Sequence, residues 1–344
     1  MKTLVILFTI FLLLNNLSLA KGEPKYLTNK SSSFDFFPED IELKDDSFQD
    51  INRSNCAEWW YFDAILNDEY SVQVIIYVFS ILKIKIAHTA LSIFKDGDAI
   101  FQNEKTHVTK FSFSTEKPTI TVDGKQIMNG YIDKKSDVWI YDVNLDMGDS
   151  SADLQFIGQS KGWKGNLTVS GWAVILPKAY VNGTLKIKGV EINVEGEGYH
   201  DHNWNMKLQS LLNFGWYWGR IITKNYSIVY YIIMDTRISY SQKVLIVANE
   251  SSYVNIKPKY MHFTASNYYF ENSRIIPHNF VLSVYAKNIS LMTKLSAFNL
   301  YHGGNTLGLR NYWRYFTNSQ GYIFKDSITE KINGTQIAEF WRFR

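Results

Sequence analysis

The chain has 344 residues, of which 46% are hydrophobic, 16% aromatic and 20% charged, a composition that supports a packed core and excludes an intrinsically disordered protein. The net charge of +3 comes from 36 basic and 33 acidic residues with no basic run, which argues against nucleic-acid binding. A single cysteine excludes a disulfide framework and a zinc site made only of cysteines.

The first 20 residues have the pattern of a secretory signal peptide. Lys2 gives the positive start, Leu4 to Leu14 is an 11-residue apolar segment, too short to cross a membrane, and Ser18-Leu19-Ala20 offers small residues for cleavage. The alternative is a signal anchor, against which the polar end of the segment argues. We therefore expect a secreted, extracellular protein with no stable membrane insertion after signal removal.

Residues 21–54 are polar and acidic and predict a leader that wraps onto the fold. Cys56, a lone thiol in an oxidising compartment, is expected to be a buried apolar residue rather than a nucleophile. The mature chain also contains eight Asn-x-Ser/Thr sequons, which are candidate glycosylation sites. They begin at Asn29, Asn52, Asn166, Asn182, Asn225, Asn249, Asn288 and Asn333.

Strand patterns dominate the rest of the chain. Residues 70–79 are rich in β-branched and aromatic side chains, and Asp96-Gly97 and Asp123-Gly124 are typical hairpin turns between apolar runs. Residues 184–195 alternate apolar and polar side chains around Lys188-Gly189, and no segment predicts a long amphipathic helix. The fold class is therefore all-β, with many strands joined by tight turns.

One internal repeat is visible. Residues 60–76 and 216–232 align without a gap at an offset of 156, and both begin with Trp-Tyr and an aromatic residue. Similar composition of aromatic strands could produce the same match. A duplicated β-unit is the physical interpretation, and it predicts two domains, at 55–186 and 187–344.

Three segments bring polar and aromatic side chains together. They are Glu58-Trp59-Trp60-Tyr61-Phe62, the run from Gly196 to Trp204, and Gly215-Trp216-Tyr217-Trp218-Gly219-Arg220. In the second segment, strand alternation puts His200, His202 and Trp204 on one face and Tyr199, Asp201 and Asn203 on the other. Its glycines permit a bend or a bulge.

These three motifs resemble the lipocalin-like family of carotenoid 1,2-hydratase and AttH, which includes hydroxyneurosporene synthases, kievitone-hydratase-type enzymes and Diels–Alder cyclases. The resemblance covers residue 55 to the end, and Gly-x-Gly-Tyr-x-Asp-His-x-Trp is its most specific part; Asn205 departs from the usual glycine. It implies two tandem lipocalin-like or calycin-like β-barrel domains with a hydrophobic pocket at or near their interface.

The resemblance also implies a chemistry. Hydration of an alkene starts with proton delivery from a carboxylic acid whose pKa is raised by an apolar site, and the carbocation is stabilised by aromatic faces. Asp201 is the candidate acid, and His200 and His202 are candidates to set its protonation or to position water. Trp60, Tyr199, Trp204, Trp216 and Trp218 would line the pocket. Glu58 and Arg220 would pair at the domain junction or bind a polar substrate end.

Other interpretations stay open. The His-Asp-His run could be a structural hydrogen-bond network, and the Trp pairs could be core packing. A metal site on His200 and His202 lacks a clear third ligand, so we expect no metal and no cofactor. The leading hypothesis is a secreted hydratase, or a related cyclase or isomerase, that acts on a hydrophobic isoprenoid or prenylated small molecule. The rival is a carrier without turnover, in which Asp201 turns into the wall.

Overall fold

The computed structural model describes residues 35–50, 56–81, 84–207, 215–236, 239–304 and 311–342. The expected signal peptide at 1–20 and the sequons at Asn29 and Asn52 lie outside the described residues. Among the described segments, no helix is long and apolar enough to cross a membrane.

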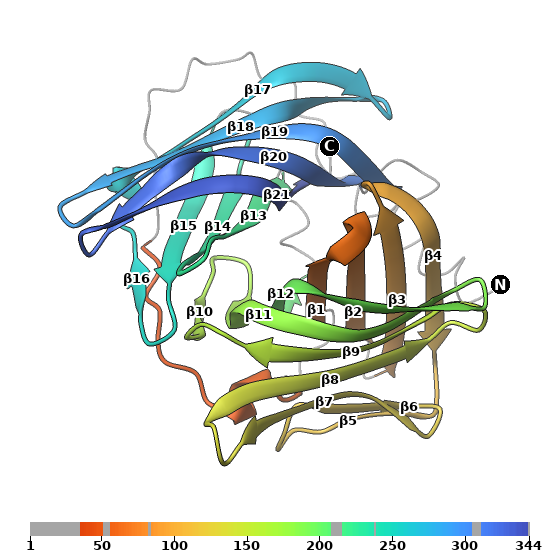
Figure 1. Cartoon of the computed structure of the whole chain (residues 1–344). Coiled ribbons are helices and arrows are strands. Elements are labelled where there is room, and N and C mark those ends of the chain that lie inside the picture. The colour runs from red at the N-terminus through yellow and green to blue at the C-terminus, as the bar shows by residue number, and fades with distance from the viewer. Residues whose placement is uncertain are drawn as a thin grey trace, which may run out of the picture. The chain divides into compact units, whose positions relative to one another are not determined.

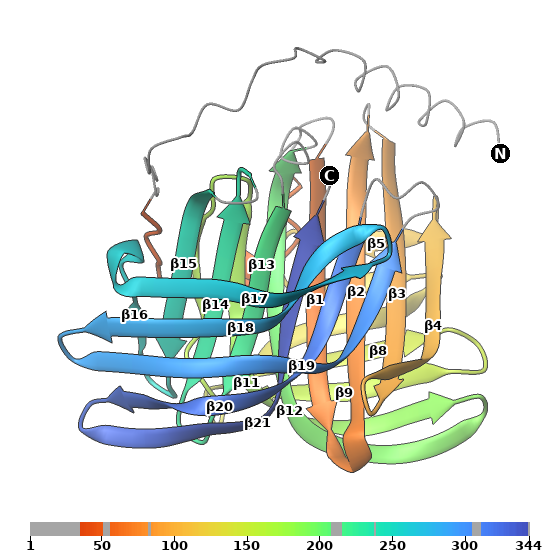
Figure 2. The same cartoon turned by 90° about the horizontal axis from the view of Figure 1, so that it is seen from above.

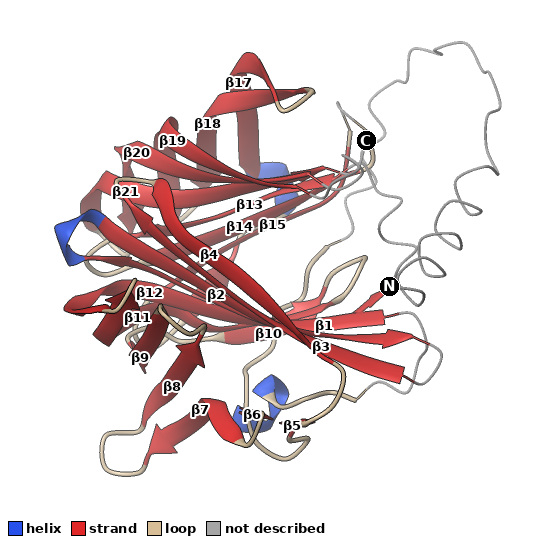
Figure 3. Cartoon of the chain, turned by 90° about the vertical axis from the view of Figure 1, so that its right-hand side faces the viewer, coloured by secondary structure: helices blue, strands red, loops and turns tan. Residues whose placement is uncertain are grey.

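Strands make up nearly all of the regular structure, with short 3-10 turns between some of them (Figure 3). The turns are η1 Leu43–Asp46, η2 Asn67–Glu69 and η4 Pro258–Tyr260. The strands are β1 Cys56–Leu66, β2 Tyr70–Ile81, β3 Ile84–Lys95, β4 Asp98–His107, β5 Phe111–Phe113, β6 Thr119–Val122, β7 Lys125–Asp133, β8 Val138–Asp146, β9 Ser151–Gly158, β10 Trp163–Asn166, β11 Gly171–Ile187, β12 Val190–Lys207, β13 Gly215–Ile222, β14 Ser227–Met234, β15 Tyr240–Ala248, β16 Tyr253–Asn255, β17 Met261–Glu271, β18 Arg274–Ala286, β19 Ile289–Gly304, β20 Asn311–Lys325 and β21 Ile328–Arg342.

These strands form two antiparallel sheets (Figures 1 and 2). The first runs β4-β3-β2-β1-β12-β11-β9-β8-β7-β6-β5, with β10 paired to β11, and the second runs β16-β15-β14-β13-β21-β20-β19-β18-β17. The all-β prediction is confirmed. The predicted turns are present too, because Gly97 and Gly124 have φ of 83° and 79°, in the left-handed region that glycine adopts readily.

Both sheets are built on one plan, since the last strand of each returns to pair with the first. The repeat detected in the sequence is the opening hairpin of each sheet, β1-β2 and β13-β14. The gapless alignment is nevertheless offset by one residue in the first strand. Trp60 packs inside the first sheet, whereas Trp216, its aligned partner, packs in the layer between the sheets. In the second strand the alignment keeps the faces, because Val72 and Ile228 both point into their own sheet's core.

The sheets divide between Lys207 and Gly215, rather than at the domain boundary of 186/187 that the sequence suggested. β11 and β12 are the two arms of one hairpin that turns at residues 188–189, and β12 also pairs with β1. The first sheet therefore needs residues 190–207, because the repeat alone carries no information about which strand closes each unit.

Three apolar clusters fill the fold. One lies inside the curved first sheet, one lies against the second sheet, and the third contains side chains of both. We call the third cluster the interlayer. The leader residues 35–50 join this packing, because Phe36 is buried against Trp163 and Trp172, and its carbonyl accepts a hydrogen bond from Asn255.

Candidate active site

The site is organised by the pairing of β1 with β12. Trp60 lies opposite His202 and Phe62 opposite His200, and these side chains point into the core of the first sheet. Tyr61 lies opposite Asp201, and both point the other way, toward the second sheet. The predicted separation of the two faces is therefore observed.

On the inner face, two histidines and two carboxylates form a buried chain. His200 Nε2 lies 3.0 Å from Asp46 Oδ2, and His202 Nε2 lies 2.9 Å from Glu58 Oε1. His202 Nδ1 lies 3.5 Å from Asp46 Oδ1, which links the two pairs. Asp46 belongs to η1 in the leader. The hydrogen bonds between the histidines and the carboxylates therefore hold the leader against the inside of the first sheet.

Aromatic rings stack on both histidines of this hydrogen-bonded group. Phe62 stacks on His200 with centroids 3.8 Å apart, and Trp60 stacks on His202 at 4.5 Å. Burial lowers the pKa of His202, but the hydrogen bond and charge of Glu58, with the charge of Asp46, outweigh it and leave that pKa above its usual value. Each histidine is hydrogen-bonded to a buried carboxylate, although Asp46 Oδ1 accepts no hydrogen bond among the described residues. Such a buried network is the structural interpretation left open above.

On the opposite face, Asp201 lies in the interlayer with 5% of its surface exposed. Its Oδ2 accepts hydrogen bonds from the Tyr199 hydroxyl at 2.7 Å and from Trp172 Nε1 at 3.0 Å. Its Oδ1 accepts from Asn203 Nδ2 at 3.3 Å. Burial raises the pKa of Asp201 to about 7, against these hydrogen bonds, which lower it. Near neutral pH this carboxyl is poised between its protonated and ionised forms.

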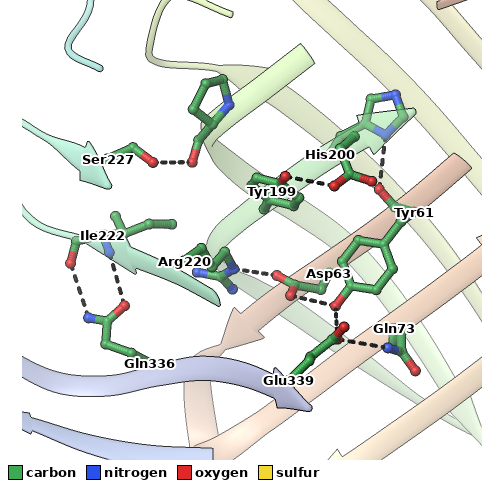
Figure 4. Close-up of polar contacts among 12 residues, drawn as sticks. Tyr61, Asp63, Gln73, Tyr199, His200, Arg220, Ile222, Ser227, Gln336 and Glu339 are labelled. Atoms are coloured by element: carbon green, nitrogen blue, oxygen red, sulfur yellow. Dashed lines mark hydrogen bonds and ion pairs between the residues drawn. The ribbon is translucent and has the colours of Figure 1, made fainter. Parts of the chain in front are cut away.

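Beside Asp201, buried ion pairs join the two sheets. Asp63 Oδ1 lies 2.6 Å from Arg220 Nε, and Asp63 Oδ2 lies 3.4 Å from Arg314 Nη1. Arg314 also lies 3.1 Å from Glu339 Oε1. Figure 4 shows Asp63 between Arg220 and the Tyr61 hydroxyl, with Glu339 on the far side of that hydroxyl.

The predicted site residues thus fall into two groups. Tyr199, Asp201, Trp216, Trp218 and Arg220 face or border the interlayer. The other predicted residues, namely Glu58, Trp60, His200, His202 and Trp204, lie in or against the core of the first sheet. The suggested Glu58–Arg220 pair does not form, because the two side chains point to opposite faces and each has another partner.

Sequence reasoning missed Asp46, Asp63, Arg314 and Glu339. Asp46 stands in the acidic leader, whose composition does not distinguish it from the neighbouring acidic residues. A usable signal existed for Glu339, since Ala338-Glu339-Phe340-Trp341 resembles Ala57-Glu58-Trp59-Trp60. Asp63 and Arg314 stand in ordinary strand sequence, and only the packing of the two sheets brings them together.

Two of the hollows at the surface of the described residues differ in their lining. One of about 760 Å³ is lined mainly by polar side chains, including Asp40, Lys161 and Lys178. The other, of about 440 Å³, lies where Ile65 and Arg220 meet Gln336. Neither is lined by Asp201 or by the histidines. Within the described residues, no group of three or more His, Cys, Asp or Glu side chains is placed to hold a metal ion.

No protein-family model matches the chain. A curated hydroxyneurosporene dehydrogenase of Chlorobaculum tepidum is 32% identical over 68 residues, and the match spans only 18% of this chain and 18% of that protein. A solved AttH structure (NE1406) of Nitrosomonas europaea superposes with a TM-score of 0.66 at 12% identity, covering 88% of this chain and 96% of that one.

The chain has the AttH fold. Kievitone hydratase from Nectria haematococca matches with a TM-score of 0.52 and 11% identity, over 84% of this chain and 89% of that one. CghA with Sch210972 matches at 0.51 and 9% identity, over 84% and 88%. The resemblance drawn from the sequence motifs is therefore confirmed, and the AttH fold in this chain places Asp201 between its two sheets.

Proposed function

We propose that the protein is a secreted, cofactor-independent hydratase, or a related cyclase or isomerase, that acts on a hydrophobic isoprenoid or prenylated small molecule. The observation that carries the proposal is Asp201, a carboxyl buried among aromatic rings and able to hold a proton near neutral pH. Kievitone hydratase and CghA, which share the fold, support an enzyme of this type.

In this mechanism Asp201 delivers its proton to one alkene carbon. A desolvated carboxyl is suited to this step because its proton is held at the pH where the enzyme works. The rings of Tyr199 and Trp218, with centroids 5.2 Å apart, present their faces and edges in the same layer, where a developing cation is stabilised. His200 and His202 point to the opposite face, so we assign them to holding β12 and the leader rather than to handling water.

A carrier without turnover is the second candidate, and one observation favours it. Both oxygens of Asp201 already accept hydrogen bonds, and neither of the two hollows reaches this side chain. For turnover, a ligand has to reach Asp201 and displace at least one of these donors. A carrier needs no access to this carboxyl.

Labelled water separates the two candidates. The protein is incubated with prenylated phenolics and carotenoid precursors in H₂¹⁸O, and the products are analysed by mass spectrometry. An enzyme that hydrates incorporates one labelled oxygen, and Asp201→Asn abolishes incorporation while binding is retained. Tight binding with no labelled product and no rearranged product would exclude the enzyme and leave the carrier.

A further inference from the structure

Glu339 occupies the position in the second sheet that Asp201 occupies in the first. Asp201 is on β12, the last strand of its sheet, opposite Tyr61 of the first strand, β1. Glu339 is on β21, also a last strand, opposite Trp218 of the first strand, β13. Tyr61 and Trp218 touch in the interlayer, with ring centroids 5.6 Å apart. Because both sheets pair their last strand with their first, each sheet places one carboxyl in the interlayer, opposite one of these two touching aromatic residues.

The two oxygens of Glu339 are not equivalent. Oε1 accepts from the Tyr61 hydroxyl at 2.8 Å, from the Tyr312 hydroxyl at 2.5 Å and from Arg314 Nη1 at 3.1 Å. Gln73 Nε2 lies at 3.5 Å from the same atom. Within the described residues, Oε2 accepts no hydrogen bond, and Glu339 keeps 8% of its surface exposed. One oxygen is thus anchored by its donors, and the other has an unused acceptor.

The surroundings of Glu339 suit a base. Burial raises the pKa of this carboxyl, and the Arg314 charge and the Tyr312 and Tyr61 hydrogen bonds oppose that shift. The charge of Glu339 also contributes to raising the pKa of Asp201, so the two carboxyls are close enough to influence each other's protonation. The next residues outward on β1 and β21, Trp59 and Trp341, are only half-buried, which puts the carboxyls one step below the edge of the interlayer.

We propose that Glu339 is a second catalytic residue of this site, whose Oε2 takes a proton from the water that adds to the substrate. This inference rests on the proposed hydratase function. The proton of Asp201 forms a C–H bond at one alkene carbon, and the π electrons leave a cation at the other. A water oxygen bonds to that cation as one of its protons passes to Glu339, giving the alcohol. Transfer of this proton to solvent, and uptake of one by Asp201, restores both groups.

The test compares Glu339→Gln with wild type, Asp201→Asn and a matched control, Glu191→Gln, which alters an exposed side chain on β12. A glutamine can still offer an oxygen to Tyr61, Tyr312 and Arg314, so the fold is expected to survive. We expect kcat for ¹⁸O incorporation to fall by about 10²- to 10⁴-fold in Glu339→Gln, with KM within about threefold of wild type. The rising acidic limb of the pH–rate profile should disappear in this variant, an effect that a merely structural role would not produce.

Each outcome has one meaning. Loss of kcat with loss of the acidic limb, and an unchanged Glu191→Gln, supports the assignment. Activity of Glu339→Gln within about threefold of wild type, while Asp201→Asn is inactive, overturns the role of Glu339 and leaves the proposed function standing. Absence of any turnover by wild type, with ligand bound, overturns the proposed function and this inference together.

Discussion

Asp63 of the first sheet pairs with Arg220 of the second, with Oδ1 2.6 Å from Nε and both side chains essentially fully buried. Replacing Asp63 with Ala removes the carboxylate that pairs with Arg220 and leaves Arg314 with Glu339 alone, so the free energy of unfolding should fall by about 3–5 kcal/mol. Urea unfolding at neutral pH measures this loss. Asp142→Asn, which removes a half-buried carboxylate bonded to Gln155, should cost less than about 1 kcal/mol. Equal losses in the two variants would contradict a special role for the pair.

The histidine–carboxylate chain in the first core should give the protein a pH-dependent stability. The pKa of His202 is raised above its ordinary 6.5 in the folded state, because Glu58 and Asp46 outweigh the effect of burial. The stabilisation of the folded state by protonated His202 is therefore fully present below pH 6.5, and it is lost as pH rises through the pKa of His202 in the folded protein. Urea midpoints measured from about pH 5 to about pH 9 should show this decline, and His202→Gln should remove it. The exposed His262→Gln is the control, and a decline that persists in His202→Gln refutes the assignment.

Asp201 should add its own pH dependence to the free energy of unfolding, at lower pH than His202 does. Its folded pKa is about 7 against an ordinary 3.8, so the folded state binds the proton more tightly than the unfolded state does. Stability conferred by the protonated form is lost as pH rises between these two values. Asp201→Asn should flatten unfolding free energies over this interval, measured by urea titration. An unchanged slope in the variant would show that the carboxyl is ionised in the folded protein throughout.

The glycines before Asp201 serve close packing. A Cβ at Gly196 would lie 2.1 Å from the carbonyl oxygen of Ile65, a backbone atom that cannot move aside. The register irregularity nearest these glycines lies between the pairs Leu176–His200 and Ala179–Gly198, so it adjoins Gly198, and the extra residue is on β11. Gly196→Ala should lower the free energy of unfolding by about 1–3 kcal/mol, measured by thermal or urea unfolding. Gly124→Asn, at an open turn position with φ of 79°, meets no neighbouring atom and should cost only the backbone strain of a left-handed residue, about 1 kcal/mol or less because asparagine tolerates this region.

If the protein is secreted, the exposure of each asparagine predicts which sequons carry glycans. Asn166, Asn288 and Asn333 are exposed, whereas Asn182 is half-buried in a strand, Asn249 is half-buried and caps its own turn, and Asn225 Nδ2 is already bonded to Glu330. In protein produced through a eukaryotic secretory pathway, glycopeptide mass spectrometry should find the first three occupied more fully than Asn182 and Asn225. Removal of glycans at the three exposed sites should leave the unfolding midpoint nearly unchanged. A secreted protein with no glycan at any sequon would contradict this assignment.

The sequence by itself determined the strands and the two faces of β12. Hairpin turns at Asp96-Gly97 and Asp123-Gly124 and a two-residue side-chain period are local properties, so they can be predicted from neighbours in the chain. The same period separated His200 and His202 from Asp201, and the motifs around Asp201 indicated the fold that the AttH comparison bears out.

Only the tertiary structure decided what each face meets. His200 and His202 find Asp46 and Glu58, which lie more than 140 residues earlier in the chain. Asp201 shares the interlayer with Glu339 because two separate sheets pack against each other. Such pairings depend on strand order, on which strand closes each sheet and on one-residue register. None of these leaves a trace in local periodicity, because a shift of one residue turns every side chain to the other face.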